Sequence, residues 1–277
     1  MRKFFKNICI ILALILLFSF VFSCTSNHLD VESLFPESLF ETKAEESESS
    51  LSTTIPDSII IPDIDLNPFS NVTMACLGSS STLPTKVDRA YPTVVQELLG
   101  LKEVYNYGGS WSTLAYKENC HCHPDSDYNH DPYVFRYSEM EAADIIVVQG
   151  GGHNDYGCLI PLGSIDDVDP TTFYGGLNIL IEGLKNEFPN SYIFFMTSFD
   201  TYNNPNITNG AGVLHRDYAD AILQACEKHN IDCLDIYHNM PFNRENDTVD
   251  GIHPTQEYID NVWSPMIADF IRENYKK

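Results

Sequence analysis

The stretch that decides the fold is VTMACLGSSS, residues 72–81. Its first six residues, Val72 to Leu77, form a short apolar run typical of a buried strand, and Gly78 with the serines after it predicts a tight turn. A helical pattern follows over residues 87–99 and is closed by Gly100. A strand that passes through a Gly-Ser turn into a helix places a serine hydroxyl beyond the carboxyl end of the strand.

The same alternation of strand and helix continues along the chain. Further short strands are expected at residues 101–105, 144–149, 192–196 and 232–236, and helices at 171–188, 214–230 and 256–275. Strands that alternate with helices predict an α/β fold, in which a parallel sheet is covered on both faces. Ligands of such sheets bind beyond the carboxyl ends of the strands.

The N-terminal segment has the pattern of an export signal. Three basic residues precede an apolar run over residues 8–22, and Val21-Phe22-Ser23-Cys24 resembles a bacterial lipobox. We therefore predict that residues 1–24 are a lipoprotein-type signal peptide lipidated at Cys24. An uncleaved membrane anchor and an ordinary signal peptide are the alternatives. Each of them places the rest of the chain outside the cytoplasm, either anchored to the cell membrane or secreted.

Residues 25–68 differ in composition from the rest of the chain. They are acidic and rich in serine, with the string Glu45-Glu46-Ser47-Glu48-Ser49-Ser50, and cannot bury enough apolar surface to fold. We expect a disordered tether followed by one domain over residues 69–277. The formal charge of the chain is −23, and most of it falls on that domain. This excess of carboxylates argues against nucleic acid as a partner.

Three further motifs lie near the ends of other predicted strands or precede the last helix. They are Asn106-Tyr107-Gly108, Gly152-His153-Asn154-Asp155 and Asp250-Gly251-Ile252-His253. The first offers a glycine amide and the second an asparagine amide to bind an oxyanion, whereas the third offers a histidine base with a carboxylate three residues before it. With a serine in the first turn, these groups suffice for acyl transfer.

These motifs resemble those of the SGNH or GDSL hydrolases. Leu77-Gly78-Ser79-Ser80-Ser81-Thr82 is similar to the family's LGDSxT segment, and the other motifs resemble its glycine, GxND and DGxHP segments in the same order. The resemblance implies a flavodoxin-like, three-layer α/β/α sandwich with a central five-stranded parallel sheet. It also implies a serine esterase or deacetylase that needs neither metal nor organic cofactor.

Carried over position by position, the resemblance makes Ser80 the nucleophile, His253 the base and Asp250 its orienting carboxylate. The oxyanion hole would consist of the Ser80 amide, Gly108 and Asn154. The main departure is Ser79, since most of the family have aspartate there. Taken alone, the Gly-Ser turn would be only a helix entry, with serine hydroxyls that cap backbone amides.

Other histidines compete with His253 for the role of the base. They are His153, His215 and His238. Only His253 has a carboxylate three residues upstream in what should be one loop, followed by Pro254 and the last helix. An isolated histidine is more often a core or surface residue. His153 lies inside the oxyanion motif, so we predict that it lines the substrate pocket. Trp111, beside the glycine motif, is a second candidate for substrate binding, with core packing as the alternative.

The segment at residues 119–123, Asn-Cys-His-Cys-His, contains residue types that bind zinc. Its alternate-residue spacing is poor for chelation, and in an exported chain disulfides are the better explanation. Cys158 could pair with Cys120 or Cys122, and Cys226 with Cys233, whereas Cys76 is expected to be a buried thiol. Sequence alone does not fix the pairing.

The predicted function is hydrolysis of a carboxylic ester by a Ser-His-Asp acyl-enzyme mechanism. An O-acetyl or other short acyl group on a carbohydrate is the expected substrate, because aromatic residues flank the motifs and the family often deacetylates glycans. The membrane would be contacted only through the N-terminal lipid anchor or signal segment. Two alternatives remain: an inactive surface glycan-binding protein that keeps the fold, and a metal-dependent or phosphoryl-transfer hydrolase.

Overall fold

The computed structural model describes residues 67–118, 120, 131–202 and 206–276. A single five-stranded sheet forms its centre, and every pair of neighbouring strands is parallel. The strand order is β2-β1-β3-β4-β5. The strands are β1 (Thr73–Gly78), β2 (Glu103–Gly108), β3 (Ile145–Gln149), β4 (Tyr192–Met196) and β5 (Asp232–Leu234). The predicted α/β class and the five-stranded parallel sheet are confirmed.

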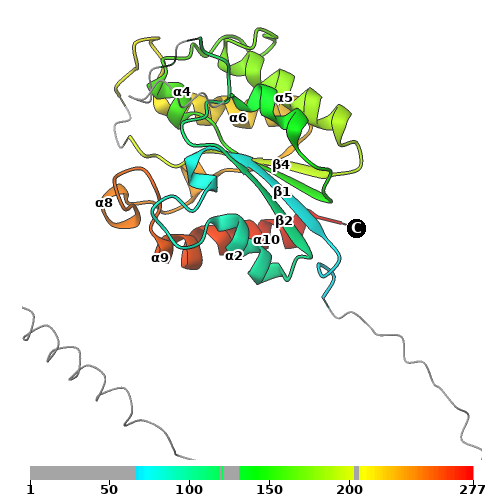
Figure 1. Cartoon of the computed structure of the whole chain (residues 1–277). Helices are drawn as coiled ribbons and strands as arrows, with labels where there is room; N and C mark the ends of the chain where they lie inside the picture. The colour runs from blue at the N-terminus through cyan, green and yellow to red at the C-terminus, as the bar shows by residue number, and fades with distance from the viewer. Residues whose placement is uncertain (1–66, 119, 121–130, 203–205, 277) are drawn as a thin grey trace, which may run out of the picture. The chain divides into compact units, whose positions relative to one another are not determined.

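Helices cover both faces of the sheet, with α5 and α6 on one face and α2 and α10 on the other (Figure 1). The larger helices are α2 (Tyr91–Leu99), α5 (Phe173–Glu187), α6 (His215–His229) and α10 (Ser264–Asn274). Shorter ones are α3 (Tyr133–Arg136), α4 (His153–Gly157), α7 (Ile236–Asn239), α8 (Arg244–Asp247) and α9 (Gln256–Tyr258). The 3-10 helices η3 (Ser80–Thr82) and η4 (Tyr137–Glu139) and the π-helical turn η5 (Ile259–Trp263) complete the set.

The alternation of side chains along each strand builds two separate cores. Ala75 and Leu77 of β1 pack with α5 and α6, whereas Met74 and Cys76 of the same strand pack with α2 and α10. All four are fully buried, as expected for a strand covered on both faces. This explains why the central strands are continuous apolar runs rather than alternating patterns.

The strand order places a switch point between β1 and β3. The chain leaves β1 toward β2 on one side and later returns to β3 on the other, so the loops after β1 and β3 diverge. A crevice forms at such a point, beyond the carboxyl ends of the two strands. The Gly-Ser turn follows β1 and the GHND motif follows β3, which brings these two motifs to the same crevice.

The strand predicted at residues 101–105 lies at Glu103–Gly108 in the structure. Two predicted helices differ from the structure by more than two residues or in regularity. The first begins at Tyr91 rather than at residue 87, because Pro92 fits the first turn of a helix, where its missing N–H is not needed. The last runs from Gln256 to Asn274 but widens into the π-helical turn η5 just before Pro265, whose ring has no N–H to donate.

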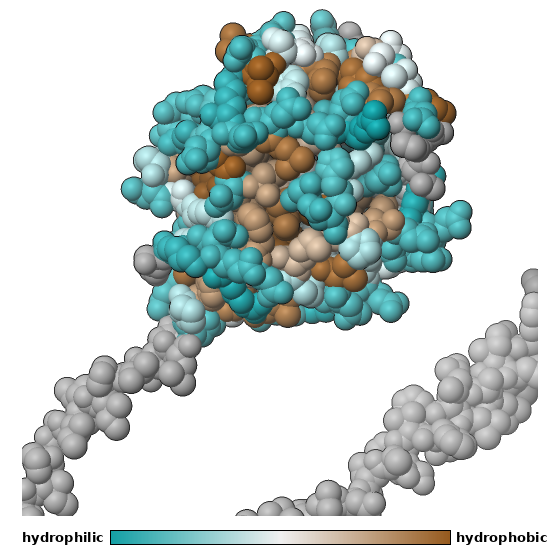
Figure 2. Space-filling view, turned by 180° about the vertical axis from the view of Figure 1, so that it is seen from behind, coloured by the Kyte–Doolittle hydropathy of each residue, from teal (hydrophilic) through white to brown (hydrophobic). Residues whose placement is uncertain are grey.

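The surface seen from behind is mostly hydrophilic, with apolar residues in patches between hydrophilic ones (Figure 2). No helix in the ranges given above is long and apolar enough to cross a bilayer. The predicted signal peptide, with Cys24, and almost all of the predicted tether lie outside the described residues.

Candidate active site

The predicted nucleophile Ser80 lies in the turn after β1, as the first residue of η3. The Thr82 amide donates to the Ser79 carbonyl (3.1 Å), and the Leu83 amide donates to the Ser80 carbonyl (3.2 Å). Gly78 is required at the end of the strand, because an added Cβ would lie 1.9 Å from Thr82 Oγ1. The tight turn places Ser80 in the lining of a cavity at the carboxyl edge of the sheet.

The structure brings the predicted serine, histidine and aspartate together. His253 Nε2 lies 2.9 Å from Ser80 Oγ, and His253 Nδ1 lies 2.9 Å from Asp250 Oδ2. The His253 amide also donates to Asp250 Oδ1 at 2.9 Å, which fixes the carboxylate against the ring. The tautomer that donates its Nδ1 proton to Asp250 leaves Nε2 to accept the proton of Ser80.

Asp250 is held in its ionised form by several donors. Lys86 Nζ lies 2.7 Å from Asp250 Oδ2. Burial alone would raise the pKa of Asp250, but the His253 amide, the Lys86 ammonium and the His253 ring donate hydrogen bonds to the carboxylate and lower the pKa below its ordinary value. A carboxylate that stays ionised can stabilise the imidazolium that forms when His253 takes a proton.

The loop that carries the base is a tight turn with a second cation beside it. Gly251 has a φ of 85°, a left-handed conformation that favours glycine. Arg244 Nε donates to the Gly251 carbonyl at 2.8 Å, and the Val249 amide donates to the His253 carbonyl at 2.8 Å. The DGIH motif is therefore a loop closed across its base, with Lys86 and Arg244 bound to its exposed side.

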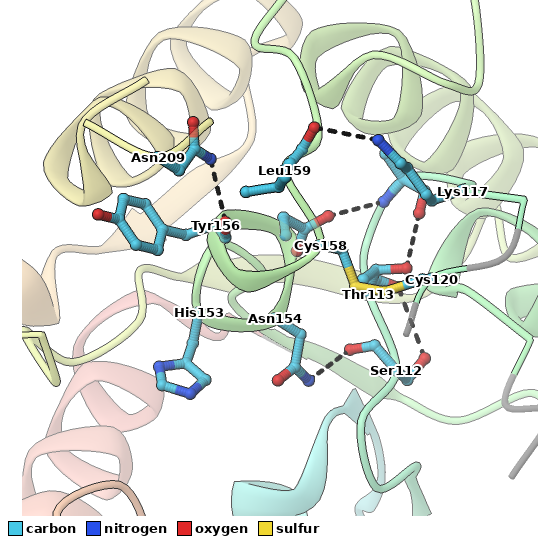
Figure 3. The surroundings of a disulfide bond; sticks show 12 residues. Ser112, Thr113, Lys117, Cys120, His153, Asn154, Tyr156, Cys158, Leu159 and Asn209 are labelled. Atoms are coloured by element: carbon cyan, nitrogen blue, oxygen red, sulfur yellow. Dashed lines mark hydrogen bonds between the residues drawn. A yellow bond between two sulfur atoms is a disulfide. The ribbon is translucent and has the colours of Figure 1, made fainter. Parts of the chain in front are cut away.

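Asn154, the predicted side-chain oxyanion donor, lies in α4 directly after β3 and lines the same cavity as Ser80. Its Nδ2 donates to the Ser112 carbonyl at 2.8 Å, and Figure 3 shows the amide pointing from α4 toward the loop of Ser112. This bond fixes the orientation of the Asn154 side-chain amide, whose nitrogen carries two protons.

Gly108 is not placed as predicted. Its amide donates to Asn106 Oδ1 at 2.9 Å, and Gly108 is not among the residues that line the cavity with Ser80. Gly108 is the last residue of β2 and pairs with Gly78. The chain turns toward the site only afterwards, so Ser112 lines the cavity instead. The motif Asn106-Tyr107-Gly108 therefore marks the end of β2, four residues before Ser112.

The predicted pocket residue His153 does line the cavity. Its Nδ1 lies 2.5 Å from Thr201 Oγ1, and its ring stacks on Tyr202 with the ring centres 4.9 Å apart. Burial lowers the pKa of His153 to about 3, with help from the neighbouring His215 and His253. His153 is therefore a neutral group at physiological pH.

Trp111, the other predicted substrate contact, lies outside this cavity. Its side chain is 42% exposed, and it is absent from the cavity lining. Its φ of 63° marks the turn between β2 and Ser112. The structure therefore keeps Trp111 near the loop of the site without bringing it to Ser80.

The cavity beside Ser80 is small, with a volume of about 20 Å³. Its lining contains mostly polar residues and glycines. It consists of Ser79, Ser80, Ser81, Ser112, Tyr133, Gln149, Gly150, Gly151, His153, Asn154, Asp155, Ser198, Phe199, Thr201 and Ile252. A cavity of this size next to the nucleophile favours a short acyl group over a long one.

Asp155 is a site residue whose importance the sequence reading missed. The side chain is fully buried and accepts backbone N–H bonds from Gly152 (2.9 Å), Leu114 (3.0 Å) and Ala115 (3.1 Å). Burial raises the pKa of Asp155 to about 6, against the opposing effect of these amides. In the sequence, only its position next to Asn154 in the GHND motif indicated that Asp155 belongs to the site. Asp155 joins the start of α4 to the segment that follows Ser112.

The other histidines are excluded as bases by their positions. His215 is only 3% exposed and lies edge-on to Tyr202, with ring centres 4.8 Å apart. His238 Nδ1 lies 3.0 Å from Asp235 Oδ1. Among the described histidines, only His253 contacts Ser80.

A disulfide joins Cys120 to Cys158, one of the two pairings expected for Cys158. Figure 3 shows that it links the loop that carries Ser112 to the end of α4, which carries His153 and Asn154. The residues between Cys120 and Asp131, including Cys122 and the histidines, lie outside the described part, as does any metal site that they would form. Within the described part, no cluster of three or more ligands could hold a metal ion.

The suggested pairing of Cys226 with Cys233 is not present, because both are free thiols in the structure. The two residues lie at the end of α6 and within β5, on either side of a turn, and both pack in the core on the α5 and α6 face. The Cys226 side chain and burial raise the pKa of the Cys233 thiol. Cys76 is a buried free thiol in β1, as expected.

Comparison with known proteins agrees with this geometry. The sequence matches the model of the GDSL-like lipase/acylhydrolase family over residues 75–257. No curated protein is detectably similar to the chain in sequence.

Solved structures share the fold over nearly their whole length. A protein from Lactobacillus plantarum is 25% identical with a TM-score of 0.62, and the match covers 74% of this chain and 99% of that one. A structure described as a possible lipase from Chitinophaga pinensis is 20% identical with a TM-score of 0.58, covering 73% of this chain and 98% of that one. The matched region contains all four motifs, and the chain belongs to the GDSL-like lipase/acylhydrolase family.

Proposed function

We propose that this protein is a serine hydrolase that cleaves carboxylic esters through an acyl-enzyme intermediate. The observation that carries the proposal is the continuous contact from Asp250 to His253 to Ser80, with 2.9 Å at each step. Family membership supports the same class of activity.

The proposed reaction begins when His253 Nε2 takes the hydroxyl proton of Ser80 and Ser80 Oγ attacks the ester carbonyl. Asp250 stabilises the imidazolium, and the Asn154 side-chain amide with the Ser80 backbone amide binds the oxyanion. The alcohol leaves with the proton from His253. Water activated by the same histidine then hydrolyses the acyl-serine. For Gly108 to contribute as first predicted, its amide would have to release Asn106.

A short acyl group, such as acetyl, fits the cavity best. The space beside Ser80 is small and is lined by serines, glycines and Gln149, which leave little apolar surface for a long chain. His153 lines the cavity, and its ring stacks on Tyr202. Aromatic rings suit the apolar faces of sugar rings. We therefore propose an O-acetylated carbohydrate as the substrate.

The test is hydrolysis of nitrophenyl acetate, nitrophenyl octanoate and acetylated sugars by the purified protein, beside Ser80→Ala and with a chelator. We expect acetate to be cleaved faster than octanoate, and turnover to disappear in Ser80→Ala but to survive the chelator. Turnover that is lost with the chelator would indicate the metal-dependent alternative. No Ser80-dependent turnover on any of the esters would favour a glycan-binding protein that has lost catalysis.

We also propose that the protein is exported and anchored through a lipid on Cys24. The Cys120–Cys158 disulfide supports this, because disulfides persist mainly in oxidising compartments. Incorporation of labelled palmitate into the wild-type protein and its loss in Cys24→Ser is the expected result. Equal labelling of both proteins, or none of either, would contradict lipidation at Cys24.

A further inference from the structure

Arg136, the last residue of α3, extends its guanidinium behind the nucleophile turn. Nη2 donates to the Gly78 carbonyl at 2.9 Å and to Ser112 Oγ at 3.1 Å, and Nη1 donates to the Tyr107 carbonyl at 2.9 Å. One side chain thus joins the ends of β1 and β2 to the loop that enters the cavity. The packing is close, since a Cβ on Gly109 would lie 3.0 Å from Arg136 Cζ.

All three groups that accept hydrogen bonds from Arg136 are neutral. Among the residues that the structure describes, no carboxylate lies within 4.0 Å of the guanidinium, and Nε is buried without a hydrogen-bond partner. By contrast, Arg89 and Arg272 are each paired with a carboxylate. Burial lowers the pKa of Arg136, but a guanidinium remains protonated in proteins. Glu139 and Asp131 act on the charge electrostatically from a greater distance. The partly buried guanidinium therefore has no directly paired carboxylate among the described residues.

Burying a charge without a direct partner costs free energy, and neutral hydrogen-bond donors could link the same three segments. The guanidinium differs from such donors by its charge, and the segments that it links carry the proposed oxyanion donors or contact them. The Gly78 carbonyl lies two residues before the nucleophile Ser80. Ser112 lines the cavity, and its carbonyl fixes the amide of Asn154. Ser80 thus lies two residues from a carbonyl that Arg136 binds, and Asn154 is hydrogen-bonded to a residue that Arg136 binds.

We propose that Arg136 is a positioning residue for the oxyanion site. It fixes Ser112, and through Ser112 the amide of Asn154, and it adds a permanent positive charge behind the point where the tetrahedral intermediate becomes negative. Preorganised charges of this kind act on the transition state more than on the neutral ester. The inference rests on the proposed acyl-serine mechanism and adds a group that no catalytic motif contains.

The closing experiment compares wild type, Arg136→Lys and Arg136→Met, with Arg272→Met as a control for loss of a surface arginine. The readouts are kcat and KM on nitrophenyl acetate, the thermal midpoint, and inhibition by a trifluoromethyl ketone, whose serine adduct is a tetrahedral anion. We expect Arg136→Met to lower kcat about 10- to 100-fold with KM nearly unchanged. The affinity for the ketone should fall by a similar factor, and Arg136→Lys should recover part of both losses.

A purely structural role would give a different result. It predicts a lowered thermal midpoint and raised KM in both variants, with no parallel between kcat and the affinity for the ketone, and this pattern would overturn the inference. Full activity of a folded Arg136→Met beside an active wild type would also overturn it, without touching the proposed function. Absence of Ser80-dependent turnover in the wild type would instead reject the proposed function, and the inference with it.

Discussion

The two halves of the site are held in place by different forces. The base half, the loop of Asp250 to His253, is bound from the solvent side by Lys86 and Arg244. The oxyanion half, around Asn154, is held by a buried carboxylate, a disulfide and a guanidinium bound to neutral groups. The loop of the base is thus held by an ion pair and a hydrogen bond from two cations near solvent. The oxyanion donors are held by contacts that water and salt reach poorly.

The largest effect should come from Asn154 itself. Asn154→Ala removes a donor to the oxyanion, which typically costs about 100- to 1000-fold in kcat. KM should change little, because the amide acts mainly on the transition state. Steady-state kinetics beside the exposed control Asn274→Ala measure this. A raised KM with unchanged kcat would mean that Asn154 binds the substrate in its ground state and that other groups bind the oxyanion.

The buried carboxylate of the oxyanion half predicts a pH-dependent stability. The pKa of Asp155 is raised from 3.8 to about 6 on folding, chiefly by burial. Its favourable contribution is therefore complete below pH 4 and is lost as the pH rises through about 6. Asp155→Asn has no such titration and directs an NH₂ group at backbone amides, so it should destabilise at every pH.

Denaturant unfolding of wild type and Asp155→Asn at pH 4 and pH 7 checks this prediction. From the raised pKa of Asp155, the stability difference between the two proteins should be larger at pH 4 than at pH 7 by about 2 kcal/mol. An equal difference at both pH values would show that the pKa of Asp155 is the same in the folded and the unfolded protein.

The disulfide of the oxyanion half gives the next effect. It closes a loop with a sequence separation of 38 residues, and a native disulfide typically contributes about 2 to 4 kcal/mol. The double variant Cys120→Ser and Cys158→Ser should lose stability by this order in unfolding measurements, and kcat should fall because α4 carries Asn154. The matched control is Cys233→Ser, since Cys233 is a free thiol. Unchanged kcat in the double variant would show that Asp155 and Arg136 hold the donors without it.

The smallest effect belongs to the base half. Lys86→Met removes one group that lowers the pKa of Asp250, but Lys86 Nζ lies near solvent, so the cost should be about 0.5 kcal/mol in low salt at pH 7. Because the folded pKa of Asp250 is depressed, this contribution is present above pH 4 and disappears as the carboxylate is protonated at lower pH.

Thermal unfolding of Lys86→Met beside Lys102→Met, an exposed lysine without a described ion pair, measures the difference. The difference in thermal midpoint between the two variants should vanish in about 1 M salt, where charges near the surface are screened. A loss as large as that of Asp155→Asn, and insensitive to salt, would remove the distinction between the two halves.

The sequence predicted the sheet and the triad because both leave local signals. Buried parallel strands are short apolar runs between turn residues, and β4 has the predicted bounds, Tyr192 to Met196. The triad follows from motifs in which each residue lies next to a turn. Ser80 and His253 are 173 residues apart in sequence, yet the carboxyl edge of a parallel sheet brings such turns together.

The remaining parts of the site depend on packing between segments that are distant in sequence. Gly108 was assigned from a motif that ends a strand, whereas the turn that follows brings Ser112 to the cavity. Nothing in the sequence near Arg136 indicates that its guanidinium reaches Gly78, because α3 and β1 meet only in the folded protein. The Cys120–Cys158 bond was one of several pairings that the sequence left open.

The measurement that tests the central claim most directly is covalent trapping of the nucleophile by a fluorophosphonate, followed by peptide mass spectrometry. The account predicts one adduct on Ser80, which is absent in Ser80→Ala and forms much more slowly in His253→Ala. An adduct on Ser79 or Ser81, or ester turnover by a protein that cannot be labelled, would contradict a nucleophile at Ser80 activated by His253.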